Sequence, residues 1–302
     1  MEIAAIPFLL LVGSLLALQA AANVQLSTAM TSPFGASALQ LAVGATLLLG
    51  LAAVFGSLGA LRLLDDVAPW ELAGGLGSAL YITAGVILFP RTGAIAAVGL
   101  FIAGQMLASV VLDTAGWLGV AREPLGVGAV AGTVAVVAGA RLIVQAQGGA
   151  AAVRPAWVAL GLLAGAALPV QGAVNAQLRA DLDAPIAAGA LSFVVATTAM
   201  ALVLAGALAL GRAPAPRIGP LRAVPWWGWL GGLCGATYVT SVFLLIPEIG
   251  AAPTIALTVA GQQLASVVVD RYGLLRLPQR VVGARRLAGV GVLLAGVALV
   301  QL

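Results

Sequence analysis

Charged residues are scarce in this chain: only 8% of its 302 residues are charged, whereas 62% are hydrophobic. A water-soluble domain carries about a quarter charged residues, so this composition excludes a soluble enzyme, a disordered chain and a nucleic-acid-binding protein. The net charge of +4 comes from arginines, because lysine is absent, and these arginines are spread over the loops and form no basic groove. The class that remains is a polytopic membrane protein.

Two chemically reactive side chains are also missing or nearly so. The chain has no histidine, which excludes histidine catalysis, histidine metal sites and the usual pH switch near neutrality. Cys234 is the single cysteine, which excludes an intramolecular disulfide and a cysteine metal cluster. The sequence also has no nucleophile beside a base and no phosphate-binding loop. We therefore expect neither an enzyme nor a protein that holds a cofactor or a metal.

What the sequence does have is long apolar runs. A helix needs about 20 apolar residues to cross a hydrocarbon core of about 30 Å, and continuous rather than alternating runs favour helices over barrel strands. We therefore expect an all-α polytopic membrane protein with ten transmembrane helices. The runs are residues 3–26, 35–61, 70–89, 93–112, 125–145, 156–178, 185–210, 226–246, 251–269 and 282–302.

An even number of helices places both termini on the same side of the membrane. The loops on that side hold Arg62, Arg122 and Arg179, and the loops on the other side hold the remaining eleven of the 14 arginines. Because arginine-rich loops stay in the cytoplasm, this bias predicts that both termini face the periplasm. The first apolar run has no basic residue before it, so we expect a helix of the mature protein rather than a secretory signal.

Two motifs occur twice in the same order, which indicates an internal repeat. The motif QxxxNxQL spans residues 19–26 and again 171–178, which is 152 residues later. The motif GQxLASVVxD spans residues 104–113 and again 261–270, which is 157 residues later. The chain is therefore predicted to be a tandem repeat of one five-helix unit.

The predicted units are residues 1–148 and 149–302. Five is an odd number, so the second unit enters the membrane from the opposite side, and the two repeats are expected to be inverted. Transporters that are built from inverted repeats bind their substrate near the midplane between the repeats, and access alternates as one half rocks against the other.

Together these motifs resemble the YdcZ-like family of bacterial inner-membrane proteins, which belongs to the drug/metabolite transporter superfamily. The two copies of each motif are similar to the fused tandem form of that family, and the resemblance covers nearly the whole chain. It implies a secondary transporter that exports a small metabolite across the bacterial inner membrane. It also implies a functional monomer whose two halves form an internal pseudo-dimer.

One feature departs from the wider superfamily. Related small multidrug transporters use a membrane-embedded glutamate in their first helix to bind protons and cations. This chain has Asn23 and Gln25 there, and Asn175 and Gln177 in the mirror helix. The resemblance therefore does not carry proton-coupled antiport over to this chain, and we expect a neutral or weakly polar solute.

Polar side chains within the apolar runs are the candidates for a substrate site. Amides in a membrane are costly unless paired, and residues four apart share one helix face. Their donors and acceptors can bind a polar solute without demanding a charge. Alternatively, they hold the two halves together by interhelical hydrogen bonds, each worth about 1 kcal/mol or less. The candidate substrate-lining residues are Gln19, Asn23, Gln25, Gln105, Ser109, Gln171, Asn175, Gln177, Gln262 and Ser266.

Two carboxylates end the repeated GQxLASVVxD motif. Asp113 and Asp270 lie near predicted helix ends, and inside a cavity either is a candidate for coupling transport to protons or sodium. Alternatively, each is an interfacial carboxylate that anchors its helix or pairs with an arginine, such as Arg122 or Arg271.

The expected partners are a small-molecule substrate and the lipid bilayer, and not nucleic acid. Two other functions fit the same architecture. In the first, the chain is a membrane scaffold or accessory subunit that transports nothing, and its amides only join helices. In the second, it is a passive channel built on the same symmetry.

Overall fold

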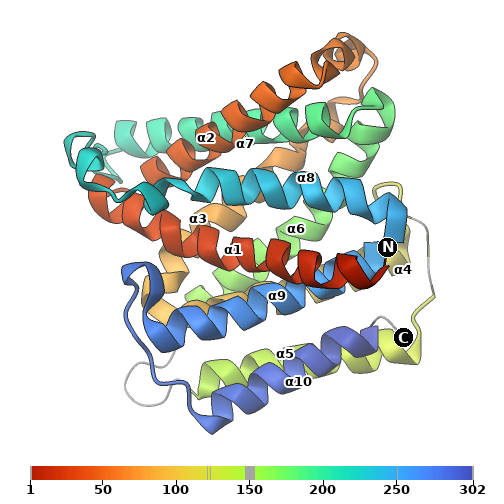
Figure 1. Ribbon diagram of the computed structural model, residues 1–302, viewed down its shortest axis with the longest axis vertical. Helices are drawn as coiled ribbons and strands as arrows, with labels where there is room; N and C mark the ends of the chain where they lie inside the picture. Colours follow the sequence, from red (N-terminus) through yellow and green to blue (C-terminus); the bar gives the residue numbers. More distant parts are fainter. Residues whose placement is uncertain (1, 121, 123, 147–153, 250, 301–302) are drawn as a thin grey trace.

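The computed structural model is a bundle of long helices (Figure 1). It describes residues 2–120, 122, 124–146, 154–249 and 251–300, and within them it has ten α-helices and no strand. The prediction of an all-helical chain is therefore confirmed. The α-helices are α1 Glu2–Met30, α2 Pro33–Val54, α3 Gly75–Thr92, α4 Ala94–Ala115, α5 Val127–Gln145, α6 Pro155–Leu182, α7 Pro185–Ala209, α8 Gly231–Ile249, α9 Ala251–Tyr272 and α10 Ala284–Val300. The short 3₁₀ helices are η1 Ser57–Asp65, η2 Pro69–Gly74, η3 Gly219–Ala223, η4 Trp226–Trp229 and η5 Leu274–Arg276.

Local sequence explains the limits of α2. Ser32 caps its start by accepting a hydrogen bond from the Gly35 backbone amide at 3.1 Å, and Pro33 occupies the first turn, where a backbone N–H has no helical partner to lose. The helix ends before Gly56, which adopts a left-handed φ of 72° that suits glycine. The predicted run 35–61 is therefore too long, and its last residues belong to η1 instead.

Two other helices begin later than the apolar runs predicted. The runs 70–89 and 226–246 open with the 3₁₀ turns η2 and η4, and the α-helices start only at Gly75 and Gly231. Apolar composition does not distinguish a 3₁₀ turn from the first turn of an α-helix, which explains the difference.

Most of the helices meet the requirements for crossing a bilayer. Seven spans within the described residues are long and apolar enough to do so. They are Ile6–Met30, Pro33–Val54, Pro69–Thr92, Ala94–Ala115, Val127–Gln145, Pro155–Leu182 and Pro185–Ala209. The helices α8, α9 and α10 complete the predicted number, and the 17 residues of α10 are at the lower limit for a spanning helix.

The main helix pairs join the first half of the chain to the second. Helix α1 packs against α8 and α9, and α6 packs in the same manner against α3 and α4. Helix α2 pairs with α7, and α5 runs beside α10 at the edge of the bundle (Figure 1). Because each half finds its principal partners in the other half, the two units form one bundle rather than two separate domains.

Close glycine contacts show that the two halves pack in the same way. A Cβ atom on Gly104 of α4 would overlap the backbone carbonyl oxygen of Leu162 in α6. A Cβ atom on Gly261 of α9 would overlap the carbonyl oxygen of Leu10 in α1. The glycines are 157 residues apart and the leucines 152, which are the offsets of the two sequence motifs. The motif glycine is thus required where its helix meets the first helix of the other repeat.

The edge pair α5 and α10 establishes the direction of the symmetry. Gly132 of α5 lies against the backbone of Gly296 in α10, and Gly139 lies against Gly289. The repeat offset of 157 relates Gly132 to Gly289, so equivalent glycines lie at opposite ends of the pair. The two helices are therefore antiparallel, and the pseudo-twofold axis runs across them, in the plane of the membrane. This is the inverted arrangement that the odd helix count predicted.

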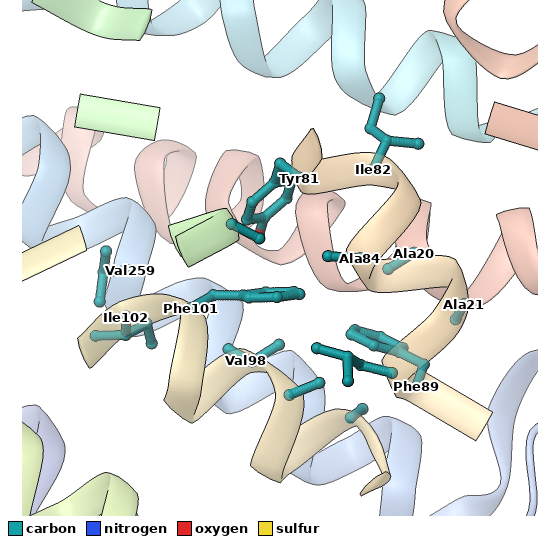
Figure 2. Close-up of a cluster of buried hydrophobic side chains, with 14 of the residues drawn as sticks. Ala20, Ala21, Tyr81, Ile82, Ala84, Phe89, Val98, Phe101, Ile102 and Val259 are labelled. Carbon is teal, nitrogen blue, oxygen red and sulfur yellow. The ribbon is translucent and has the colours of Figure 1, made fainter. Parts of the chain in front are cut away.

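An apolar core surrounds the polar side chains of the interior. Buried residues of α1, α3, α4 and α9 meet in one cluster (Figure 2). Phe89 and Phe101 are among its largest fully buried side chains, and the ring of Tyr81 lies with its centroid 4.7 Å from that of Phe101. The polar groups described next are set in this apolar surrounding, where an unpaired group is costly.

Candidate functional site

Two buried amides lie together in the first half of the molecule. Asn23 of α1 and Gln40 of α2 are each 1% exposed, and a Cβ atom on Gly231 at the start of α8 would overlap the side-chain oxygens of both. We call these three residues the first amide cluster. Among the described residues, neither the oxygen nor the nitrogen of either amide has a hydrogen-bond partner. The cluster therefore presents two donor groups and two acceptor groups that the protein itself leaves unused.

The equivalent positions in the second half form a different set. Asn175 of α6, Ser192 of α7 and Gly74 of η2 occupy the positions of Asn23, Gln40 and Gly231, and we call them the second amide cluster. Here the Asn175 Nδ2 donates a hydrogen bond to the Ser192 Oγ at 3.1 Å. Only the Asn175 Oδ1 is unpaired within the described part of the chain. The second cluster is therefore mostly satisfied, while the first is not.

The glutamines one turn earlier differ in the same direction. Gln171 of α6 and Ser78 of α3 exchange two hydrogen bonds: Gln171 Nε2 donates to the Ser78 Oγ at 2.8 Å, and the Ser78 Oγ donates to Gln171 Oε1 at 3.0 Å. Gln19 of α1 instead faces Gly235 of α8, which has no hydroxyl to offer. In the second half, therefore, a polar pair joins the two repeats, and in the first half the corresponding glutamine lacks that serine.

The polar stripe of the fourth helix in each repeat is also divided. In α9, Gln262 donates a hydrogen bond to the hydroxyl of Tyr81, and the Ser266 Oγ donates to the carbonyl oxygen of Gln263 in its own helix at 2.6 Å. In α4, Gln105 is buried and its Nε2 has no partner among the described residues, and Ser109 is partly buried. Unused groups in this stripe are not confined to the first half, because both amide atoms of the buried Gln263 in α9 also have no partner among the described residues.

The last amide of each QxxxNxQL motif lies apart from the clusters. Gln25 Nε2 donates to the carbonyl oxygen of Leu275 at 2.8 Å, and Gln177 lies against Gly119 in the mirror loop. Leu275 and Leu118, its equivalent, both have positive φ values, of 55° and 57°. These two glutamines therefore contact the loop that follows the fourth helix of the other repeat, and the structure does not bring them together with Asn23 or Asn175.

Asp270 caps a helix of the other repeat. Its carboxylate is 2% exposed and accepts hydrogen bonds from the backbone amides of Ala94 at 2.8 Å and Ile95 at 3.0 Å, at the start of α4. A carboxylate there satisfies two free N–H groups and interacts favourably with the helix dipole. This contact supports the anchoring alternative for Asp270. Its mirror residue, Asp113, is partly buried near the end of α4.

Three polar residues of this region escaped the sequence analysis. Gln40, Ser78 and Ser192 are each buried and either face a predicted site residue or bond to it. None of them lies in a repeated motif, because each has a different residue at its mirror position. The only signal in the sequence is a single polar residue within an apolar run, as for Gln40. A fourth residue, Glu71, is 5% exposed, and its carboxyl group lies near that of Asp181.

Comparison with known proteins places the chain in a family. The family model described as "Putative inner membrane exporter, YdcZ" matches it twice, over residues 4–142 and 156–299. A solved structure described as "Crystal structure of protein" is 20% identical, with a TM-score of 0.58 over 97% of this chain and 96% of its own, and it shows the fold alone. No curated protein matches the chain. The resemblance inferred from the two motifs is thus confirmed, and the chain belongs to the YdcZ family of inner-membrane proteins.

Proposed function

We propose that this chain is a secondary transporter that exports a small, neutral, polar metabolite by alternating access, and that the first amide cluster binds it. The observation that carries the proposal is the set of four unpaired amide atoms on Asn23 and Gln40. A buried donor or acceptor without a partner costs about 1–3 kcal/mol. A polar solute that supplies partners to these atoms recovers that cost when it binds.

The chemistry of the cluster indicates the kind of solute. Each amide offers an N–H donor and a carbonyl acceptor and carries no charge. No ionisable side chain belongs to the cluster, so a strongly charged solute would lose its hydration without gaining an opposite charge. Hydroxyl, amide and carbonyl groups on a small metabolite match the first amide cluster best.

The contrast between the two clusters supports a mechanism of alternating access. Inverted repeats reach the opposite-facing state when the two halves exchange conformations. In such an exchange, the first amide cluster takes up the paired arrangement that Asn175 and Ser192 now have, and the second cluster loses it. The solute then leaves because its partners have turned to each other. We propose further that the chain works as a monomer with both termini in the periplasm.

Solute counterflow in proteoliposomes tests this function. Proteoliposomes that contain the purified protein are loaded with an unlabelled neutral, cationic or anionic metabolite. Uptake of the labelled form is then followed with and without a pH gradient. We expect saturable counterflow of a neutral polar solute, and we expect Asn23→Leu to abolish it while the thermal stability is kept. Thr46→Val is the matched control, because Thr46 is exposed on α2 and its hydroxyl bonds only to the Ala42 carbonyl of its own helix.

The same measurement separates the other functions. A passive channel gives flux without counterflow, which contradicts the proposal. A membrane scaffold gives no flux for any solute from protein that is demonstrably folded. Counterflow that survives in Asn23→Leu confirms transport but removes the first amide cluster from the binding site.

A further inference from the structure

A surface pocket lies where the loop after α9 meets the start of α10. Its volume is about 360 Å³. The residues that line it are Ala146, Arg280, Val281, Gly283, Arg285 and Arg286. It lies among the loops of the arginine-rich side of the membrane. None of its lining residues belongs to the first amide cluster, so the proposed transport site does not include it.

The pocket carries more positive charge than its surroundings neutralise. Three of its six lining residues are arginines, in a protein in which only 8% of residues are charged. Arg286 is only 7% exposed, although a buried guanidinium is costly without an anionic partner. Asp270 is the carboxylate near Arg280 and Arg286, and both of its oxygens accept backbone hydrogen bonds from α4. Among the residues that the structure describes, Asp270 therefore lies near two of the three guanidinium groups that line the pocket.

The backbone adds to this positive field. The pocket includes Gly283, the residue before the first turn of α10, so the free N–H groups of a helix start point toward the same region. A helix start combined with arginine side chains is a favourable arrangement for a phosphate group, because guanidinium groups bind its oxygens in pairs.

The other repeat has a pocket in the corresponding loop that is lined by one arginine and not by three. A pocket of about 420 Å³ there is lined by Thr114, Arg122, Pro124 and Leu125, of which Pro124 is the mirror residue of Val281. The repeat offset places Glu123, Gly128 and Ala129 opposite Arg280, Arg285 and Arg286. Both repeats thus have a pocket beside this mirror position, whereas the three arginines belong to one of them.

Membrane topology alone does not explain this placement. Positive charge anywhere in the loops of that side orients the protein, and the α7–α8 loop already supplies Arg212, Arg217 and Arg222. Those residues are exposed to solvent. A topology signal needs neither a buried arginine nor three arginines around one pocket.

We infer that this pocket binds a phosphate-bearing anion, either the headgroup of an anionic phospholipid or a soluble phosphate compound. The guanidinium groups of Arg285 and Arg286 contact the phosphate oxygens, and Arg280 holds the wall of the pocket by donating to the carbonyl oxygen of Pro90 at 3.1 Å. Binding at this position links α10 to the α3–α4 junction and stabilises the folded protein.

Thermal unfolding of the purified full-length protein tests the inference. The unfolding temperature is measured in detergent with increasing inorganic phosphate, at an ionic strength held constant with chloride, and in nanodiscs of phosphatidylcholine with or without phosphatidylglycerol. Wild type, Arg285→Gln, Arg286→Gln and the control Arg212→Gln are compared. Arg285 and Arg212 are both exposed, so their substitution leaves the fold intact and removes equal charge from the same side.

We expect phosphate or phosphatidylglycerol to raise the unfolding temperature of the wild type and of Arg212→Gln. We expect Arg285→Gln and Arg286→Gln to weaken this binding about tenfold. A response to inorganic phosphate identifies a soluble anion, and a response to phosphatidylglycerol alone identifies the lipid headgroup. The inference is overturned if neither probe stabilises the wild type, or if Arg212→Gln loses the response as fully as Arg285→Gln does.

Discussion

The two amide clusters occupy equivalent places in the two repeats, yet their hydrogen bonding differs. Around the second amide cluster, Ser192 satisfies Asn175 and Ser78 satisfies Gln171. Around the first amide cluster, the positions of those two serines hold Gln40 and Gly235, and the amides of Asn23 and Gln40 are unpaired among the described residues. The packing of the backbone is shared, so the difference arises from a few side chains. It indicates that the second amide cluster is held together by polar contacts, whereas the first amide cluster keeps its polar groups available.

The largest effect is expected from breaking what the two halves share. Gly104→Leu and Gly261→Leu each place a side chain against a backbone carbonyl that cannot move unless two helices separate. We expect each to destabilise the fold by about 1–3 kcal/mol or more, and to a similar extent, measured by thermal unfolding and size-exclusion chromatography. Gly50→Leu is the control, because nothing lies within 4 Å of its Cβ position. Equal tolerance at Gly104 and Gly50 would contradict the symmetric packing.

The next effect concerns the carboxylate that crosses from one repeat to the other. Asp270→Ala removes two hydrogen bonds to the start of α4, and we expect a loss of about 1–2 kcal/mol in the free energy of unfolding. Any dependence of transport on a pH gradient is expected to persist in this variant. If the stability is unchanged and the pH-gradient dependence is lost, Asp270 couples transport to protons instead of capping the helix.

A smaller loss is expected from the polar pair of the second half. Ser78→Ala deprives Gln171 of its partner in α3, and we expect a destabilisation of about 0.5–1 kcal/mol, since interhelical hydrogen bonds in membranes contribute roughly that much. Thr46→Val, which removes a hydroxyl bonded only within its own helix, should change stability by less. Equal effects of the two substitutions would show that the pair does not join the repeats.

An effect on stability of similar size, but of opposite sign, is expected when the first amide cluster is made to resemble the second. Gln40→Ser places at residue 40 the hydroxyl that Ser192 provides in the mirror cluster, so that Asn23 gains a partner. We expect a gain of about 0.5–1 kcal/mol in stability together with slower counterflow. Faster or unchanged counterflow would show that the unpaired amides of the first amide cluster do not serve transport.

Much of the fold could be predicted because its signals are local or repeated. Apolar runs identify spanning helices wherever they occur, and the two motifs identify the repeat and hence its inversion. The limits of the helices were less predictable, because 3₁₀ turns such as η2 and η4 have the same apolar composition as the helices that follow them. The start of α8 therefore lies five residues after the predicted position of 226.

The candidate site could be predicted only in part. Asn23 and Asn175 were found because their motif repeats, and both are buried. Their neighbours Gln40 and Ser192 lie in different helices and differ between the repeats, so only the packing of α1 on α2 and of α6 on α7 reveals them. Whether an amide is paired depends on such neighbours, and for this reason the sequence left the choice between binding and structural roles open.

The most direct test of the account compares Asn23→Leu with Asn175→Leu, in both solute counterflow and thermal unfolding. The two asparagines are equivalent by symmetry and equally buried, at 1% exposure each. The account predicts that Asn23→Leu loses counterflow and keeps the wild-type unfolding temperature, whereas Asn175→Leu is less stable because Ser192 loses its partner. Equal losses of stability in both variants, with counterflow retained in Asn23→Leu, would contradict a binding role for the first amide cluster.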